Sequence, residues 1–161
     1  MENITDILAE NARRTAAMRA PYDPLTGQGS HLPRVEAIDP KGTPCRIPQT
    51  MADDPAILTV ARDRHAWCML RFSHDFEFWA ATCVRIKDKL SGRDIPFVLN
   101  RPQRRVLAVL EGMRVARRPI RLIMLKARQW GGSTLIQMYM AWIQCIHHRN
   151  WHSLICAHVK D

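Results

Sequence analysis

The stretch that most constrains the fold runs from residue 120 to residue 153. Residues 120–125 are apolar apart from Arg121, and a short turn with two adjacent glycines follows them. Residues 133–147 then carry apolar side chains at helical spacing, and a second apolar run begins at Ser153. Short apolar runs bounded by turn signals are typical of buried parallel strands, and a helix this apolar is expected to pack against a sheet. The pattern therefore predicts a strand, a tight turn, a helix and a second strand, and with them an α/β fold with a parallel sheet.

The turn after residue 125 partly matches the phosphate-loop pattern G-x-x-x-x-G-K-[ST]. Gly131 and Ser133 fit the pattern, but Lys126 stands where the first glycine belongs and Gly132 stands where the lysine belongs. A chain that leaves a strand, turns and starts a helix directs backbone N–H groups and the positive helix end at one point. Glycines let such a backbone approach phosphate oxygens closely. The alternative is an ordinary helix N-terminus with Ser/Thr caps and a basic surface turn.

If the turn binds phosphate, its side chains have separate roles. Lys126 and Arg128 supply cations that can reach phosphate oxygens. The hydroxyl of Ser133 is placed to bind Mg²⁺, with Thr134 as the next candidate. Trp130 either supports the loop by packing or covers a nucleotide base, and the sequence leaves both roles open.

Residues 126–144, KARQWGGSTLIQMYMAWIQ, resemble the deviant Walker A region of large terminase subunits from tailed bacteriophages. In that family the loop carries an Arg-Gln pair, as Arg128 and Gln129 do here, and some members place the lysine at the start of the loop. Residues 94–103, DIPFVLNRPQ, resemble the family's adenine-recognising Q motif, with Gln103 as its glutamine. Two separate motifs in the expected order make this resemblance specific.

The resemblance implies a P-loop ATPase that drives DNA into a procapsid, with ATP and Mg²⁺ as cofactors. Double-stranded DNA, the small terminase subunit and the portal are the partners that it implies. Outside the resemblance, Gln103 is an ordinary first-turn glutamine. The resemblance assigns nucleotide binding to Gln103, Lys126, Arg128, Gln129, Gly131, Gly132, Ser133 and Thr134.

The expected domain organisation is an N-terminal helix, a Pro/Gly-rich linker or arm, and the start of an ATPase domain, at residues 1–20, 21–50 and 51–161. Within the last of these, helices are expected over residues 55–72 and 76–90 and after Asn100, a good N-cap. The acidic residue that completes the Mg²⁺ site of such ATPases and the carboxylates of a terminase nuclease domain do not occur in this sequence. We therefore expect a partial P-loop NTPase core, preceded by a helical N-terminal region, without a complete catalytic set.

The charge of the chain favours an anionic partner. The formal net charge is +9, and nucleic acid is the first partner that such a balance suggests. A solvated helix face is the alternative explanation for the arginines. These features also allow a basic DNA-binding or phage assembly module without nucleotide hydrolysis. A third alternative is an ATPase of the helicase type, which would share the Q motif and the loop. The arginine cluster consists of Arg104, Arg105, Arg114, Arg117, Arg118 and Arg121.

No uninterrupted apolar run in the sequence approaches the ~18 residues that a membrane helix needs. The N-terminus lacks the basic-then-apolar layout of a signal peptide. We therefore expect a protein of the host cell cytoplasm without a membrane partner. The five cysteines are widely spread and contain no C-x-x-C pair, so they indicate neither a disulfide framework nor a zinc ribbon.

Overall fold

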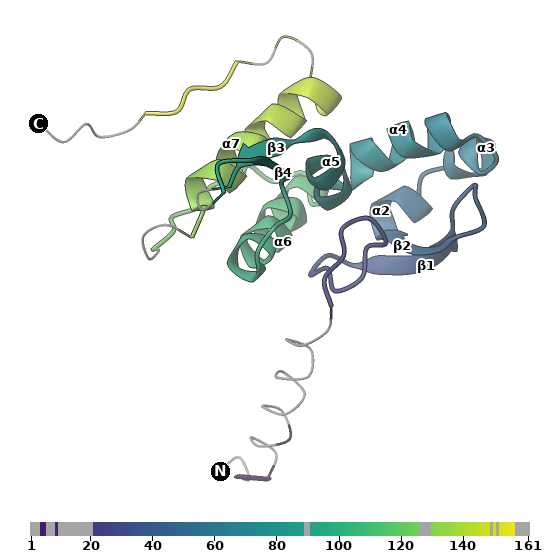
Figure 1. Cartoon of the computed structure of the whole chain (residues 1–161), viewed down its shortest axis with the longest axis horizontal. Helices are drawn as coiled ribbons and strands as arrows, with labels where there is room; N and C mark the ends of the chain where they lie inside the picture. Colours follow the sequence, from purple (N-terminus) through teal and green to yellow (C-terminus); the bar gives the residue numbers. More distant parts are fainter. Residues whose placement is uncertain are drawn as a thin grey trace, which may run out of the picture.

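The computed structural model describes residues 4, 5, 9, 21–88, 91–125, 130–148, 150 and 152–156, and the statements below concern these residues. Most of them form short helices and strands that follow one another closely (Figure 1). In chain order the elements are β1 (Arg34–Ile38), β2 (Pro44–Pro48), α2 (Gln49–Ala52), α3 (Ile57–Val60), α4 (Arg64–His74), α5 (Phe76–Cys83), β3 (Arg85–Lys87), β4 (Asp94–Pro96), α6 (Arg101–Val115), α7 (Gly132–Trp142) and a π-helical turn, η1 (Ile143–His147).

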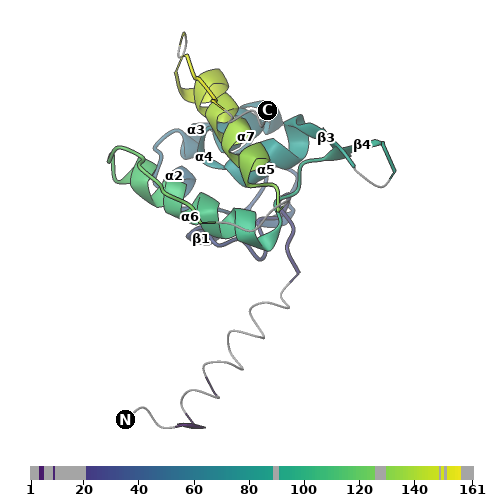
Figure 2. The ribbon, with the colours of Figure 1, turned by 90° about the vertical axis from the view of Figure 1, so that its left-hand side faces the viewer.

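The elements form two neighbouring groups (Figure 1). In the first group, the antiparallel hairpin of β1 and β2 packs with α2, and α2 and α3 contact α4. The second group contains α5, α6, α7 and the antiparallel hairpin of β3 and β4, and α4 joins the groups through its contacts with α5 and η1. The β3–β4 hairpin extends outward from the body of the molecule (Figure 2).

The prediction of a partial P-loop NTPase core with a parallel sheet is wrong. The sheets that the structure describes are two-stranded and antiparallel. Residues 120–125, predicted as the strand before the loop, form no strand, and the side chains of Ile123 and Leu125 are fully exposed. Residues 152–156, at the start of the second predicted strand, also form none. A parallel strand needs a hydrogen-bonded neighbour and cover on both faces, and these apolar runs receive neither from the described part of the chain. The fold is mixed α/β with two small antiparallel sheets.

Two predicted helices are interrupted. The helix expected over residues 55–72 is divided between α3 and α4, because Asp63 caps a new helix by accepting hydrogen bonds from two backbone N–H groups of α4, at 2.8 and 3.1 Å. The helix expected over residues 76–90 ends at Cys83, where the chain turns into the extended conformation of β3. The N-terminal helix expected over residues 1–20 lies outside the described residues except for residues 4, 5 and 9.

The range 21–50, for which the sequence suggests a linker or irregular arm, contains the β1–β2 hairpin. Its turn is organised by Asp39, whose carboxylate accepts hydrogen bonds from the backbone N–H groups of Lys41 and Thr43, both at 2.8 Å. Gly42 adopts a φ of 81°, a left-handed conformation that glycine reaches without a Cβ clash. Pro40 and Gly42 lie in the turn, and Pro44 and Pro48 lie at the two ends of β2, so these residues are compatible with an ordered hairpin.

A buried cluster of charged side chains joins this hairpin to the helices. The guanidinium group of Arg34 in β1 donates hydrogen bonds to Asp75, at 2.7 and 2.8 Å, and to Glu77, at 2.7 Å. Asp75 also accepts a hydrogen bond from Arg71 at 3.1 Å and caps α5 through the backbone N–H of Phe78. Burial raises the pKa of Asp75, but the hydrogen bonds and charges of the two arginines outweigh that effect and hold the pKa below its ordinary value.

The core of the second group is centred on the fully buried Trp142 of α7. Its indole Nε1–H donates a hydrogen bond to the backbone carbonyl of Phe72 at 2.7 Å, and its ring meets Phe76 edge-on with 5.6 Å between ring centroids. The hydroxyl of Tyr139 donates to Glu111 of α6 at 2.7 Å. The helix predicted over residues 133–147 is confirmed as apolar and packed, but α5 and α6 cover it instead of a parallel sheet.

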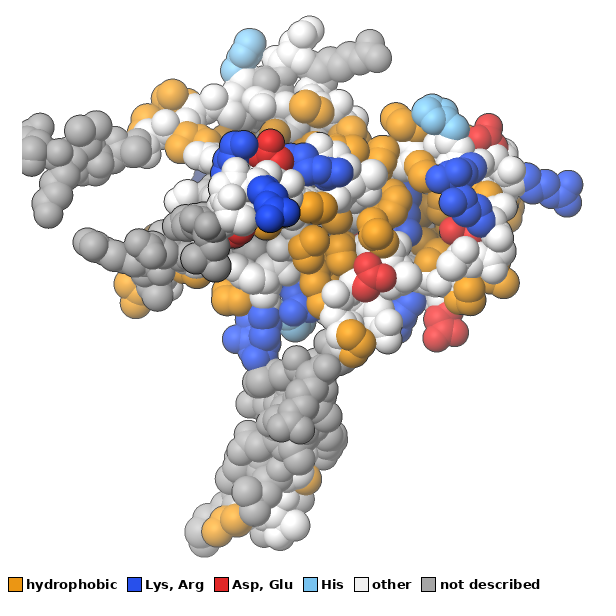
Figure 3. Space-filling model, viewed as in Figure 1, with side chains coloured by type: hydrophobic (Ala, Val, Ile, Leu, Met, Phe, Trp, Pro, Cys, Tyr) orange, Lys and Arg blue, Asp and Glu red, His pale blue; other side chains and the backbone are white. Residues whose placement is uncertain are grey.

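The outer surface combines charged and apolar side chains. Figure 3 shows hydrophobic side chains in the middle of one face, with Lys and Arg side chains on either side of them. Among the described residues, no helix combines the length and the apolar character that crossing a membrane requires.

We predict that Asp75→Asn lowers the free energy of unfolding at pH 7 by about 3–5 kcal/mol, because it leaves two buried arginines without their shared anion. Because the folded-state pKa of Asp75 is lowered, its contribution is present above about pH 4 and is lost as the pH falls through the lowered value. Urea unfolding across this acid range measures both effects.

Asp94→Asn is the control: Asp94 forms an exposed ion pair with Lys87 at 2.9 Å, and its loss should cost less than about 1 kcal/mol. Equal effects of the two substitutions would contradict the prediction.

Candidate functional site

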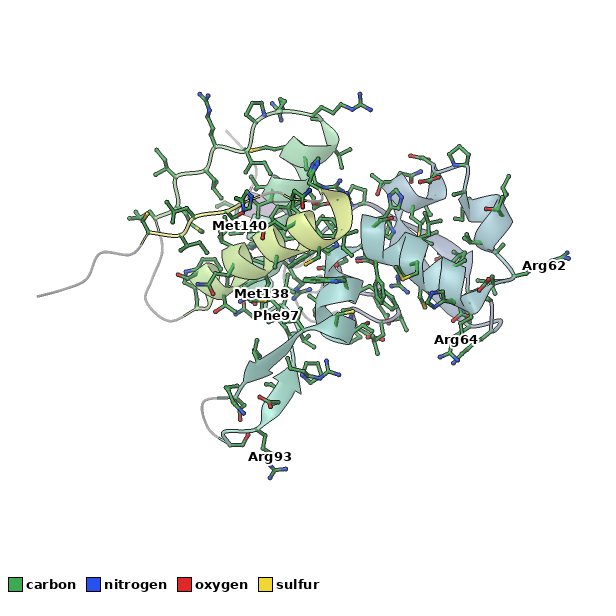
Figure 4. All side chains as sticks on the ribbon, turned by 90° about the horizontal axis from the view of Figure 1, so that it is seen from above. Arg62, Arg64, Arg93, Phe97, Met138 and Met140 are labelled. Atoms are coloured by element: carbon green, nitrogen blue, oxygen red, sulfur yellow. The ribbon has the colours of Figure 1, made fainter. Side chains whose placement is uncertain are left out.

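A cavity of about 690 Å³ lies between the β3–β4 hairpin, the segment that leads into α6 and the first turn of α7. In Figure 4 the hairpin leaves the body beside Phe97 and carries Arg93 at its outer end. The cavity is lined by Ile86, Lys87, Asp88 and Ile95 of the hairpin, by Phe97, Val98, Asn100 and Gln103, and by Trp130, Gly131, Gly132, Ser133 and Thr134.

The cavity brings together most of the site residues predicted from the sequence. The glutamine of the Q-like motif and the four residues of the turn lie on its walls, although they are about thirty positions apart in the chain. The other predicted residues, Lys126, Arg128 and Gln129, lie outside the described residues. The described residues that meet at this cavity are Gln103, Gly131, Gly132, Ser133 and Thr134.

The N-terminus of α7 forms one wall of the cavity. Gly131 is the N-cap residue, in the left-handed conformation with φ 81° and ψ 21°, and no side chain of the described residues caps the helix. Gly132, Ser133 and Thr134 follow as its first turn. The first N–H groups of a helix have no partner within the helix, and they place a partial positive charge at this end. An uncapped helix end that opens into a cavity suits an anion such as phosphate.

Two amide side chains from the start of α6 hold the turn before α7. Asn100 and Gln103 form a capping box: the side chain of Asn100 accepts from the N–H of Gln103 at 3.0 Å, and Gln103 Oε1 accepts from the N–H of Asn100 at 2.9 Å. Gln103 Nε2 also donates to the carbonyl of Gly131 at 2.9 Å, and Asn100 Nδ2 donates to the carbonyl of Trp130 at 3.0 Å. The N-cap predicted at Asn100 is confirmed, and Gln103, only 4% exposed, uses both polar ends within the protein.

Trp130 packs within the turn. A Cβ atom added to Gly132 would lie 2.6 Å from the indole ring of Trp130, so the ring rests directly against this glycine. A Cβ added to Gly131 would lie 2.6 Å from Nε2 of Gln103. Both positions therefore exclude any residue larger than glycine unless the neighbouring side chain moves. Of the two roles that the sequence leaves open for Trp130, this contact favours support of the loop.

The contribution of the β3–β4 hairpin is missing from the sequence analysis, which assigned part of it to a helix. Ile86 and Ile95 pair across the hairpin and give the cavity an apolar wall. The alternation of polar and apolar residues on either side of the Ser91-Gly92 turn is the sequence signal that indicates such a hairpin. A helix is predicted there instead of a hairpin because the aromatic and apolar residues from Phe76 onward continue at helical spacing.

A positive region lies beside the cavity, at the start of α6. Arg101, Arg104 and Arg105 occur in its first two turns, and the first turn contains no acidic residue. Cations are unfavourable at this end of a helix, because they meet the positive end of its dipole. Burial lowers the pKa of His31, and the charges of these three arginines lower it further. A second cavity of about 460 Å³ is lined in part by Arg101, Arg105 and Trp130.

The described residues contain no group of three or more His, Cys, Asp or Glu side chains that could hold a metal ion. The exposed Ser133 therefore suits Mg²⁺ only as one ligand among phosphate oxygens and water, which is how Mg²⁺ is commonly held with nucleotides. Comparisons of this chain with protein-family models, with curated proteins and with solved structures each give no match.

We predict that Gly131→Ala destabilises the protein by about 1–2 kcal/mol, because alanine is strained at this left-handed position and its Cβ would displace Gln103. Gly112→Ala is the matched control. Gly112 lies in α6 with nothing within 4 Å of an added Cβ, so alanine there should stabilise the helix by about 0.5–1 kcal/mol. Thermal unfolding of the two variants tests the pair, and a neutral Gly131→Ala would refute the geometry of the turn.

Proposed function

We propose that this chain is the N-terminal, ATPase-side part of a bacteriophage terminase large subunit, and that its cavity binds the phosphate groups of ATP together with Mg²⁺. One observation supports the proposal above all: Gln103 and the turn Gly131–Thr134, which belong to two separate sequence motifs, line the same cavity. The proposal rests on this site and on the residues of the two sequence motifs. It does not include the parallel-sheet fold that the sequence suggested.

The residues present fit a nucleotide phosphate group. The uncapped N–H groups at the start of α7 offer hydrogen bonds to phosphate oxygens, and the two glycines leave room for a close approach. Lys126, Arg128 and Gln129 belong to the same turn and would supply charge and further donors. The hydroxyl of Ser133, or of Thr134, would contribute to Mg²⁺ binding. When bound, ATP would supply the phosphoanhydride bond whose hydrolysis drives DNA packaging in the intact protein.

The opposite wall of the cavity suits a nucleoside. Ile86, Ile95 and Phe97 offer apolar contacts of the kind that a base makes.

The partners that the proposal includes are double-stranded DNA, the small terminase subunit and the portal, and the proposed location is the cytoplasm of the host cell.

A second candidate is a basic DNA-binding or phage assembly module that hydrolyses no nucleotide. The arginines at the start of α6 favour it, because their charges oppose the helix dipole and depress the pKa of His31. Several positive charges at the positive end of a helix repel one another and the helix dipole, and a bound polyanion such as DNA would offset this repulsion. Such a module would bind DNA with an affinity that falls steeply with salt, in proportion to the number of phosphate contacts. Its nucleotide retention would not depend on Lys126.

We predict that MgATP stabilises the full chain against thermal unfolding, by about 2.7 kcal/mol at one hundred times its dissociation constant. Lys126→Ala and Arg128→Ala should each weaken ATP binding about tenfold in calorimetric titrations, because each removes a charged partner of the phosphates.

Lys41→Ala is the control for this experiment, since it removes the same charge from the turn of the β1–β2 hairpin. It should leave ATP affinity unchanged. Equal losses in all three variants would indicate a general charge effect. Absence of ATP binding by the wild-type chain, with salt-sensitive DNA binding retained, would favour the second candidate.

A further inference from the structure

We propose that Gln103 is a positioning residue, which holds the turn before α7 in its anion-binding geometry and does not select the base of the nucleotide. This inference rests on the proposed phosphate site and assigns Gln103, with Asn100, a specific role there. It departs from what the resemblance to the Q motif implies, in which the glutamine recognises adenine.

Hydrogen bonds to two carbonyls of the turn fix the direction of its peptide groups. Gln103 Nε2 donates to the carbonyl of Gly131, which also accepts the N–H of Leu135 in α7 at 3.0 Å, and Asn100 Nδ2 donates to the carbonyl of Trp130. In a planar trans peptide the carbonyl of one residue and the N–H of the next point in opposite directions. Because both carbonyls are tied to the start of α6, the N–H groups of Gly131 and Gly132 are directed away from α6. The two amide side chains thereby orient the donors that a phosphate would meet.

Both polar ends of the Gln103 side chain already have a partner within the protein, which fixes the plane of the amide. Its Oε1 accepts the backbone N–H of Asn100 at 2.9 Å, while its Nε2 donates to Gly131 at the same distance. An amide that reads an adenine edge presents a donor and an acceptor side by side to the base. Turning Gln103 toward a base would break the capping box of α6 and release Gly131 at the same time.

Gln103 packs directly against the turn, with no space for a side chain at position 131. The side chain is 4% exposed, and Nε2 would lie 2.6 Å from a Cβ atom at position 131. Gln103 can therefore occupy this position only because residue 131 is a glycine, and the two motifs depend on each other for their packing. The phosphate end of the site depends on Gln103 even though the glutamine belongs to the segment that the resemblance assigns to the base.

Two substitutions isolate this role. Gln103→Glu and Asn100→Asp each keep the oxygen that caps α6, remove the N–H donor that holds the turn and add one negative charge. Gln103→Met removes the donor without adding charge, and it also removes the oxygen that accepts the backbone N–H of Asn100. Gln137→Glu is the matched control, because it places the same new charge on an exposed position of α7.

The probes are inorganic tripolyphosphate and MgATP, titrated into the full chain. We expect Gln103→Glu, Gln103→Met and Asn100→Asp to lower the affinity for both probes by about tenfold, with the ratio of the two affinities unchanged. The Gln137→Glu control should change either affinity less than about twofold. A loss of MgATP affinity with unchanged tripolyphosphate affinity would show that Gln103 reads the base and would overturn the inference, as would unchanged affinities for both probes.

A second measurement separates this inference from the proposed function. In protein labelled with fluorotryptophan, the fluorine NMR signal of Trp130 is assigned by Trp130→Phe and observed without any ligand. Gln103→Glu and Asn100→Asp should shift it, and Gln137→Glu should not. If the wild-type chain binds neither probe, the proposed function fails, and this signal alone decides the role of Gln103. A shift would then support the positioning role, and an unchanged signal would overturn it.

Discussion

The candidate site depends on the hydrogen bonds that Asn100 and Gln103 make to each other and to the turn before α7. The same two side chains cap α6 and hold the carbonyls of Trp130 and Gly131. A helix end binds anions only when its N–H groups are directed at the ligand and have no other partner. In this protein the turn is held both by α7, whose Leu135 N–H donates to the carbonyl of Gly131 at 3.0 Å, and by the two amides of the neighbouring helix; among the described residues no side chain caps α7.

This arrangement is connected to the segment that precedes the first hairpin of the chain. Arg104, the residue after Gln103, donates a hydrogen bond to the carbonyl of Gly29, and its guanidinium group lies 4.0 Å above the ring of Tyr22. The ion cluster around Asp75 fixes the β1–β2 hairpin, which follows this segment, against α4 and α5. Buried ion pairs of this kind contribute little net stability but are costly to break, so they define one arrangement of the elements.

The parts of the structure that local sequence determines were predictable. Asn100 as an N-cap and the apolar spacing of residues 133–147 define α6 and α7, and the two motifs contain most of the described residues that line the cavity, although not Ile86, Lys87 and Asp88. The prediction of a parallel sheet is wrong because residues 120–125 have the apolar pattern of a buried strand, whereas the described part of the chain gives them no strand partner. Both hairpins were missed, since prolines obscure the alternation of one and the helical spacing from Phe76 extends into the other.

The central claim is that the N–H groups at the start of α7 bind phosphate. Backbone amide NMR spectra of the full chain, recorded while MgATP is added, test it most directly. The account predicts that the largest changes occur at the amides of Gly131, Gly132 and Ser133, with the side-chain amide of Gln103 also affected. Changes confined to the arginines at the start of α6, or no changes at all, would contradict it.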